Sequence, residues 1–143
     1  MIPIVAVIIL SLDQLTKFLA GAALTLNQSL PVINGIFNLT LIHNRGAAFG
    51  ILKNQVPFFI FASLIAIFLI YKNIKAHGHN FSYNLALGLI LSGAIGNLID
   101  RVIFGYVIDF LDFRIWPVFN VADSAITIGA AIILLKCIPL SAK

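Results

Sequence analysis

The 143-residue sequence contains five acidic residues, and all five are aspartates: Asp13, Asp100, Asp109, Asp112 and Asp123. Two carboxyl groups brought close together share one proton, so such a pair can activate a water as base and protonate a leaving group as acid. Asp109 and Asp123 suit this role because neither has a basic residue at local pairing distance. Asp123 also opens an apolar helix, whose N-terminal dipole favours an anion. The chemistry of aspartic proteases is therefore one hypothesis.

The remaining acids have simpler interpretations. Asp13 and Lys17 lie four residues apart on one predicted helix face with the acid first, which favours a structural ion pair. Asp100 is expected either to pair with a cation from another helix or to act in a site. Arg101 is expected either to snorkel or reach a carboxylate, as a structural residue, or to act in a site. Asp112 is expected to be solvated in a connection between elements.

The composition indicates a membrane protein. Hydrophobic residues make up 61% of the chain, charged residues 10%, and the mean hydropathy is +1.07. Ordinary soluble domains are about 45–50% apolar and about 25% charged, and disordered chains are poorer still in apolar residues. The basic residues are scattered without a run, so no nucleic-acid partner is expected. Cys137 is the only cysteine, and neither a metal nor another cofactor is predicted.

Elements that would hold the aspartates follow from the apolar runs, because one bilayer crossing takes roughly 20 apolar residues. We predict an all-α membrane protein with a single domain, 1–143, and four transmembrane helices at about 2–26, 55–71, 84–104 and 121–139. Residues 37–41 alternate apolar and polar side chains between Gly35 and Gly46, which is typical of a short strand or hairpin. The aromatic-rich residues 105–120 suit a segment at the membrane interface.

Four antiparallel spans bring distant polar residues to one membrane face. The end of span 1, the start of span 2, the end of span 3 and the start of span 4 share that face. Lys and Arg counts on the two faces nearly tie. The short loop 72–82 has the purest basic character, so we place this loop and both termini in the cytoplasm. The polar residues expected on the other face are those of the loop 27–55, with Asn97, Asp100, Arg101, Asp109, Asp112, Asn120 and Asp123.

Five motifs occur in order along the chain: DQLTK at 13–17, NRGAAFG at 44–50, GAIGNLIDR at 93–101, GYVIDF at 105–110 and FNVAD at 119–123. With these motifs the chain resembles bacterial lipoprotein signal peptidase, the type II (prolipoprotein) signal peptidase, over essentially its whole length. The resemblance implies an aspartic endopeptidase that cleaves prolipoproteins before a cysteine carrying diacylglycerol.

The resemblance also implies where such an enzyme lies and what surrounds it. It would be a multi-pass protein of the bacterial inner membrane with both termini cytoplasmic and its active site near the extracytoplasmic face. A small extracytoplasmic β-sheet, matching residues 36–50, and a short interfacial helix are expected. The partners would be diacylglyceryl-modified prolipoproteins and membrane lipid, and the protein is expected to be a monomer that uses no cofactor.

Residue by residue, the resemblance assigns catalysis to Asp109 and Asp123. Many relatives carry arginine just before the asparagine of the second motif, where this chain has His43, so a role for that arginine in substrate contact does not transfer. The aromatic segment 104–119 is a candidate lid. The matches to the family's supporting residues are Asp13, Lys17, Asn44, Asn97, Asp100, Arg101 and Asn120.

Two other classes of function remain at the level of the sequence. Carboxylates inside a membrane also mark proton and ion pathways. The acids here gather at one face rather than forming a chain across the bilayer, which favours a site over a path. A purely structural membrane partner is the other alternative, and it predicts that loss of Asp109 or Asp123 lowers stability without abolishing a reaction.

Overall fold

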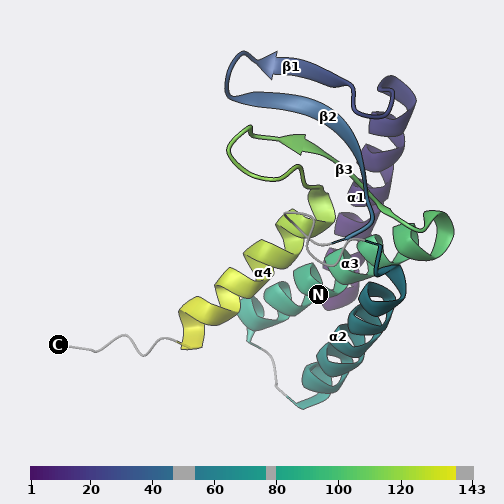
Figure 1. Ribbon diagram of the computed structural model, residues 1–143. Coiled ribbons are helices and arrows are strands. Elements are labelled where there is room, and N and C mark those ends of the chain that lie inside the picture. Colours follow the sequence, from purple (N-terminus) through teal and green to yellow (C-terminus); the bar gives the residue numbers. More distant parts are fainter. Residues whose placement is uncertain (47–53, 77–79, 138–143) are drawn as a thin grey trace.

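The computed structural model describes residues 1–46, 54–76 and 80–137 (Figure 1). Within these ranges the chain forms helices and one small sheet. The helices are α1 (Ile2–Ala23), α2 (Val56–Ala76), α3 (Phe81–Phe104) and α4 (Val121–Cys137), and the strands are β1 (Ser29–Ile33), β2 (Phe37–Asn44) and β3 (Val107–Asp112).

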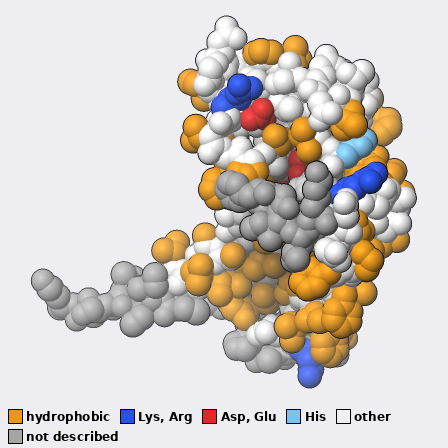
Figure 2. Space-filling model, viewed as in Figure 1, with side chains coloured by type: hydrophobic (Ala, Val, Ile, Leu, Met, Phe, Trp, Pro, Cys, Tyr) orange, Lys and Arg blue, Asp and Glu red, His pale blue; other side chains and the backbone are white. Residues whose placement is uncertain are grey.

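Three of these helices are long and apolar enough to cross a membrane: α1, residues 56–73 of α2, and α3. Their mean hydropathies are 1.8, 1.9 and 1.6, whereas α4, with 17 described residues, is not among them. Helix α3 starts at Phe81, before the expected position, because the side chain of Asn80 accepts a hydrogen bond from the N–H of Tyr83. Figure 2 shows hydrophobic side chains over much of the helical part in this view.

Helix α3 is the centre of the helical part and contacts α1, α2 and α4. Half of its apolar window is buried, against 11% for α1 and 6% for α2. Small residues make this packing close: a Cβ atom at Gly93 would overlap the carbonyl oxygen of Ala122 on α4, and one at Gly88 would lie 3.1 Å from Val5 on α1. Close approach at small residues is the usual way in which membrane helices pack.

The sheet is antiparallel with the strand order β1-β2-β3. Gly35, at φ +76°, turns β1 into β2, and Gly105, at φ +75°, ends α3 directly before β3. The buried side chains of Leu41 and Phe110 pack on Ala20 and Leu24 at the end of α1. The sheet therefore lies over that end of α1, and its strand β3 connects α3 to the segment that leads to α4 (Figure 1).

The structure extends the predicted sheet beyond residues 36–50. Strand β2 lies inside that range, residues 47–50 fall outside the described parts of the chain, and β1 and β3 flank it. Residues 107–112, expected in an interfacial segment, form β3, and Phe119 returns to bridge Leu111. None of the elements in the described ranges is a short interfacial helix.

The expectation that Asp112 is solvated is wrong. Its side chain is 8% exposed. Its Oδ2 accepts a 2.7 Å hydrogen bond from Thr40 Oγ1, and its Oδ1 accepts one of 2.9 Å from the N–H of Arg114. Because β2 and β3 pair at this point, Asp112 stabilises the sheet and the turn that follows it.

Candidate active site

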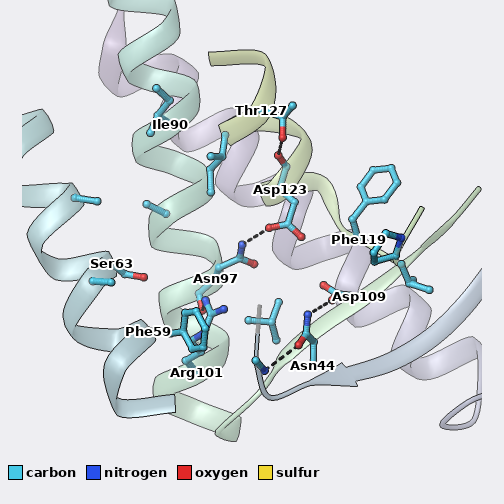
Figure 3. A pocket seen from close by; sticks show the side chains of 18 of the residues that line it. Asn44, Phe59, Ser63, Ile90, Asn97, Arg101, Asp109, Phe119, Asp123 and Thr127 are labelled. Atoms are coloured by element: carbon cyan, nitrogen blue, oxygen red, sulfur yellow. Dashed lines mark hydrogen bonds between the residues drawn. The ribbon is translucent and has the colours of Figure 1, made fainter. Parts of the chain in front are cut away.

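A cavity of about 510 Å3 lies between α2, α3 and α4, and residues of the sheet and of the 116–119 connection line one end (Figure 3). Asp109 and Asp123 both line it, together with Asn44, Asn97 and Arg101. The other walls of the cavity consist mainly of apolar or small side chains, such as Ala62 and Ala66 on α2 and Ile90 on α3. The cavity therefore has a polar end and apolar walls, and the apolar walls could bind a hydrophobic segment of a ligand.

Asp109 lies in β3 and is 1% exposed. Ile42 pairs with Asp109 and Asn44 with Val107, so Asn44 and Asp109 are diagonal neighbours on one face of the sheet. Asn44 Nδ2 donates to Asp109 Oδ2 at 3.0 Å, and Asn120 Nδ2 donates to Asp109 Oδ1 at 2.6 Å. Both carboxyl oxygens of Asp109 are therefore held by amide donors.

The environment raises the pKa of Asp109 from 3.8 to about 7. The first cause is burial, which disfavours the charged carboxylate, and the second is the negative charge of Asp123. The hydrogen bonds from Asn44 and Asn120 oppose the rise. A carboxyl group with a pKa of about 7 exchanges a proton readily at neutral pH, as an acid–base catalyst must.

Asp123 faces the same cavity from the first turn of α4 (Figure 3). Its N–H donates to Asn120 Oδ1 at 2.8 Å, so the Asn120 side chain caps the start of α4. Asn97 Nδ2 donates to Asp123 Oδ1 at 2.7 Å. Asn120 therefore contacts both aspartates, through its amide nitrogen on Asp109 and its amide oxygen on the backbone of Asp123.

Lys17 determines which way the Asn97 amide points. Its Nζ, which can only donate, lies 3.1 Å from Asn97 Oδ1, and Asn120 Nδ2 donates to the same oxygen at 3.1 Å. The amide nitrogen of Asn97 is thereby turned to Asp123. A lysine on α1 thus orients a donor to the cavity from the far side of α3.

Lys17 also joins two buried carboxylates. Its Nζ lies 2.8 Å from Asp13 Oδ2 and 2.9 Å from Asp100 Oδ2, and the three side chains are 2%, 0% and 1% exposed, respectively. The predicted pairing of Asp13 with Lys17 is confirmed, as is that of Asp100 with a cation from another helix. Sequence reasoning assigned no role to Gln14, whose amide donates to Asp13 Oδ2 at 3.2 Å and Asp100 Oδ1 at 3.1 Å. A polar amide beside two charged residues in an apolar run was the available signal.

Arg101 reaches the cavity from the last turns of α3. Its guanidinium lies 5.0 Å from the ring centre of Phe59 on α2 and donates to the backbone oxygen of Asn97 at 3.3 Å. Its positive charge interacts with the carboxylates of Asp123 and Asp109. Its place beside Phe59 is visible in Figure 3.

His43, the residue that departs from the family pattern, is not among the described residues that line the cavity. Its ring stacks on Tyr106 with centroids 3.9 Å apart. Burial and the nearby charge of Arg45 lower the pKa of His43 below 6.5, so its imidazole is neutral at pH 7. It contributes a flat aromatic contact near the end of β2 and no charge.

All the site residues expected from the sequence belong to one connected set of interactions. In the described part of the chain, no group of three or more His, Cys, Asp or Glu side chains could hold a metal ion. The interactions that connect the set are Asp109 with Asn44 and Asn120, Asn120 with Asn97, Asn97 with Asp123, Lys17 and Arg101, and Lys17 with Asp13 and Asp100.

Comparison with known proteins gives a consistent result. The family model described as signal peptidase (SPase) II matches residues 5–139. The lipoprotein signal peptidase of Halothermothrix orenii is 48% identical over 136 residues, 94% of this chain and 93% of the relative. That of Caldanaerobacter subterraneus subsp. tengcongensis is 52% identical over 132 residues, with coverages of 91% and 90%. A solved bacterial membrane enzyme, 35% identical, superposes with a TM-score of 0.89 over 98% of this chain and 94% of its own.

Proposed function

Because the chain belongs to the signal peptidase II family and is a membrane peptidase, we propose that it cleaves diacylglyceryl-modified prolipoproteins before the lipidated cysteine. The observation that carries this proposal is a pair of aspartates, the buried Asp109 and the partly buried Asp123, which face one cavity with apolar walls (Figure 3). A lipid-modified substrate lies in the bilayer, so its protease needs a polar centre beside an apolar groove.

In the proposed mechanism, Asp109 and Asp123 share one proton and hold a water between them. The ionised carboxylate takes a proton from the water as its oxygen attacks the scissile carbonyl, and the protonated carboxyl group donates to the carbonyl oxygen. When the tetrahedral intermediate collapses, the C–N bond breaks and a proton passes to the cysteine nitrogen. The mechanism uses protein carboxylates and water alone.

The supporting residues act through the contacts described above. Asn44 and Asn120 would hold Asp109, and Asn97 would hold Asp123. Arg101 would place a positive charge beside the oxyanion that forms on the substrate. Asp13, Lys17 and Asp100 would be structural supports behind the site, since their side chains are buried away from the cavity.

The proposal includes an arrangement in the membrane. The single domain 1–143 would cross the bacterial inner membrane four times as a monomer, with α4 as the fourth crossing, both termini cytoplasmic and the dyad near the extracytoplasmic face. Ile115 and Trp116, 93% and 60% exposed, would enter the lipid interface. Trp116 also lines the cavity, as a residue of a lid would. The short interfacial helix stays a prediction.

Cleavage of a synthetic precursor in proteoliposomes tests the proposal. Two versions of the precursor, with and without diacylglycerol on the cysteine, are incubated with the protein. The masses of the products are then measured by mass spectrometry. We expect cleavage of the lipidated version immediately before the cysteine and little turnover of the other. Equal turnover of both, or a different cleavage point, would contradict the proposed substrate. A proton-flux measurement on the same vesicles addresses the ion pathway, for which we expect no flux above empty liposomes.

A further inference from the structure

The two proposed catalytic aspartates are each preceded by a residue whose backbone is held by a buried carboxylate. The N–H of Ala122, directly before Asp123, donates to Asp13 Oδ1 at 2.8 Å. The N–H of Ile108, directly before Asp109, donates to Asp100 Oδ2 at 3.1 Å. Each contact fixes the backbone one residue away from a catalytic side chain.

The holding carboxylates of Asp13 and Asp100 are linked to each other by two side chains of one helix. Lys17 Nζ lies 2.8 Å from Asp13 and 2.9 Å from Asp100. Gln14 Nε2 lies 3.2 Å from Asp13 Oδ2 and 3.1 Å from Asp100 Oδ1. Two buried carboxylates repel each other, so their separation depends on the donors placed between them.

We propose that Gln14 is a positioning residue: together with Lys17 it fixes the separation of the Asp13 and Asp100 carboxylates, and through Ala122 and Ile108 the separation of Asp123 and Asp109. The inference rests on the proposed function of these two aspartates. Lys17 supplies the charge that balances the carboxylates, and Gln14 supplies a neutral second bridge. The amide nitrogen also lies 3.4 Å from the backbone oxygen of Gly96, so the bridge is tied to α3.

A second cavity leaves room for a test at this position. Gln14 lines a space of about 450 Å3 with Phe18, Gly21 and Phe104, on the α1 side of the molecule. A methionine has the length of glutamine without its N–H donors, and it can occupy the same space. Gln14→Met therefore removes the bridge with little change of volume.

The test compares Gln14→Met with the wild-type protein in the precursor-cleavage assay over pH 4 to 9. Misplacement of the aspartates is expected to lower kcat about 10- to 100-fold with KM nearly unchanged. The alkaline limb of the kcat profile is also expected to move to lower pH, because a larger separation weakens the repulsion that keeps a proton on the pair. Among the described residues, the charged groups that act on Asp109 are Asp123 on α4, Arg101 on α3 and Lys17 on α1, and the variant changes none of them.

Two controls make the result specific. Thr16→Val alters a side chain of α1 that, within the described ranges, bonds only to carbonyl oxygens of its own helix, and it should leave kcat and the pH profile unchanged. Gln14→Asn keeps both N–H donors on a shorter side chain and should give an intermediate kcat. It serves as the test variant if thermal unfolding in detergent shows that Gln14→Met does not fold.

A wild-type kcat for the test variant would overturn the inference, as would a kcat lowered by the same factor at every pH, since the latter indicates less folded enzyme. An Asp123→Asn arm separates this failure from failure of the proposed function. If Asp123→Asn is inactive while Gln14→Met behaves like wild type, only the positioning role of Gln14 is lost. If Asp123→Asn cleaves normally, the dyad itself is wrong.

Discussion

Replacing Asp109 with asparagine should make the protein inactive and, at alkaline pH, more stable. Burial and the charge of Asp123 raise the pKa of Asp109 from 3.8 to about 7. At 1.36 kcal/mol for each tenfold change in proton affinity, this difference corresponds to about 4 kcal/mol. The Asp109 side chain is 1% exposed, so solvent screens this energy only weakly.

The sign of the effect follows from proton binding. Below pH 3.8 the folded and unfolded states both hold the proton on Asp109, and the group contributes no difference. Between pH 3.8 and about 7 the folded state keeps the proton and the unfolded state releases it, so stability falls as the pH rises. Above pH 7 the full cost of about 4 kcal/mol is present.

An asparagine at this position avoids that cost but loses part of the hydrogen bonding. Its single oxygen can accept from Asn44 or from Asn120 but not equally well from both, which costs about 2 kcal/mol. At pH 8 the Asp109→Asn variant should therefore be about 2 kcal/mol more stable than wild type, and at pH 4 about 2 kcal/mol less stable. For a chain of this length, each kcal/mol changes the melting temperature by roughly 3 °C.

Thermal unfolding of both proteins in detergent at pH 4 and pH 8 measures the reversal. Asp112→Asn is the matched control, because it replaces another buried carboxylate of β3 that holds Thr40 and the Arg114 N–H. It should lower the melting temperature at pH 8. A melting temperature of Asp109→Asn below that of wild type at both pH values, or the same difference from wild type at both, would contradict a raised pKa of Asp109.

Three further substitutions test other parts of the structure. Asn44→Ala removes the 3.0 Å donor to Asp109 and should lower kcat about 10- to 100-fold, measured by precursor cleavage, whereas an unchanged rate would show that the donor is dispensable. Gly93→Ala places a Cβ against the backbone of α4 and should lower the free energy of unfolding by about 1–3 kcal/mol, measured by thermal unfolding. Gly21→Ala is the control, because a Cβ there meets nothing within 4 Å. Equal melting temperatures of the two variants would contradict the close packing of α3 on α4. Thr40→Val removes the 2.7 Å bond to Asp112 and should lower stability by about 1–3 kcal/mol while kcat stays near wild type, so a loss of activity without a loss of stability would speak against a structural role.

The helices were predictable because each one is formed by a long apolar run, whereas the positions of their ends were not predictable. Helix α3 begins at Phe81 because Asn80 caps it, and a single asparagine among polar residues does not distinguish itself in the sequence. Strand β1, Ser29–Ile33, contains Pro31 at the sheet edge and has all five residues exposed, so no alternation marks it. Strand β3 was not predicted, because the aromatic residues around it favoured an interfacial segment over residues 105–120.

Contacts within the site were predictable to the extent that they are local. Asp13 and Lys17 are one helical turn apart, so their ion pair follows from spacing. The bond from Lys17 to Asn97 joins residues 80 positions apart, and only the packing of α1 on α3 reveals it. Asp112 was expected to be solvated because its partner, Thr40, lies 72 positions earlier in the chain. The remaining site residues were assigned to one site by their match to the family motifs, because their spacing in the sequence does not indicate that they are in contact.

Asp109 and Asp123 are proposed to act as one catalytic pair. The most direct measurement is the rate at which wild type, Asp109→Asn and Asp123→Asn cleave the same diacylglyceryl-modified precursor, with folding of each variant verified by thermal unfolding. We expect both variants to fold and both to lose cleavage by about three orders of magnitude or more. Turnover within about tenfold of wild type by either folded variant would contradict the proposed pair.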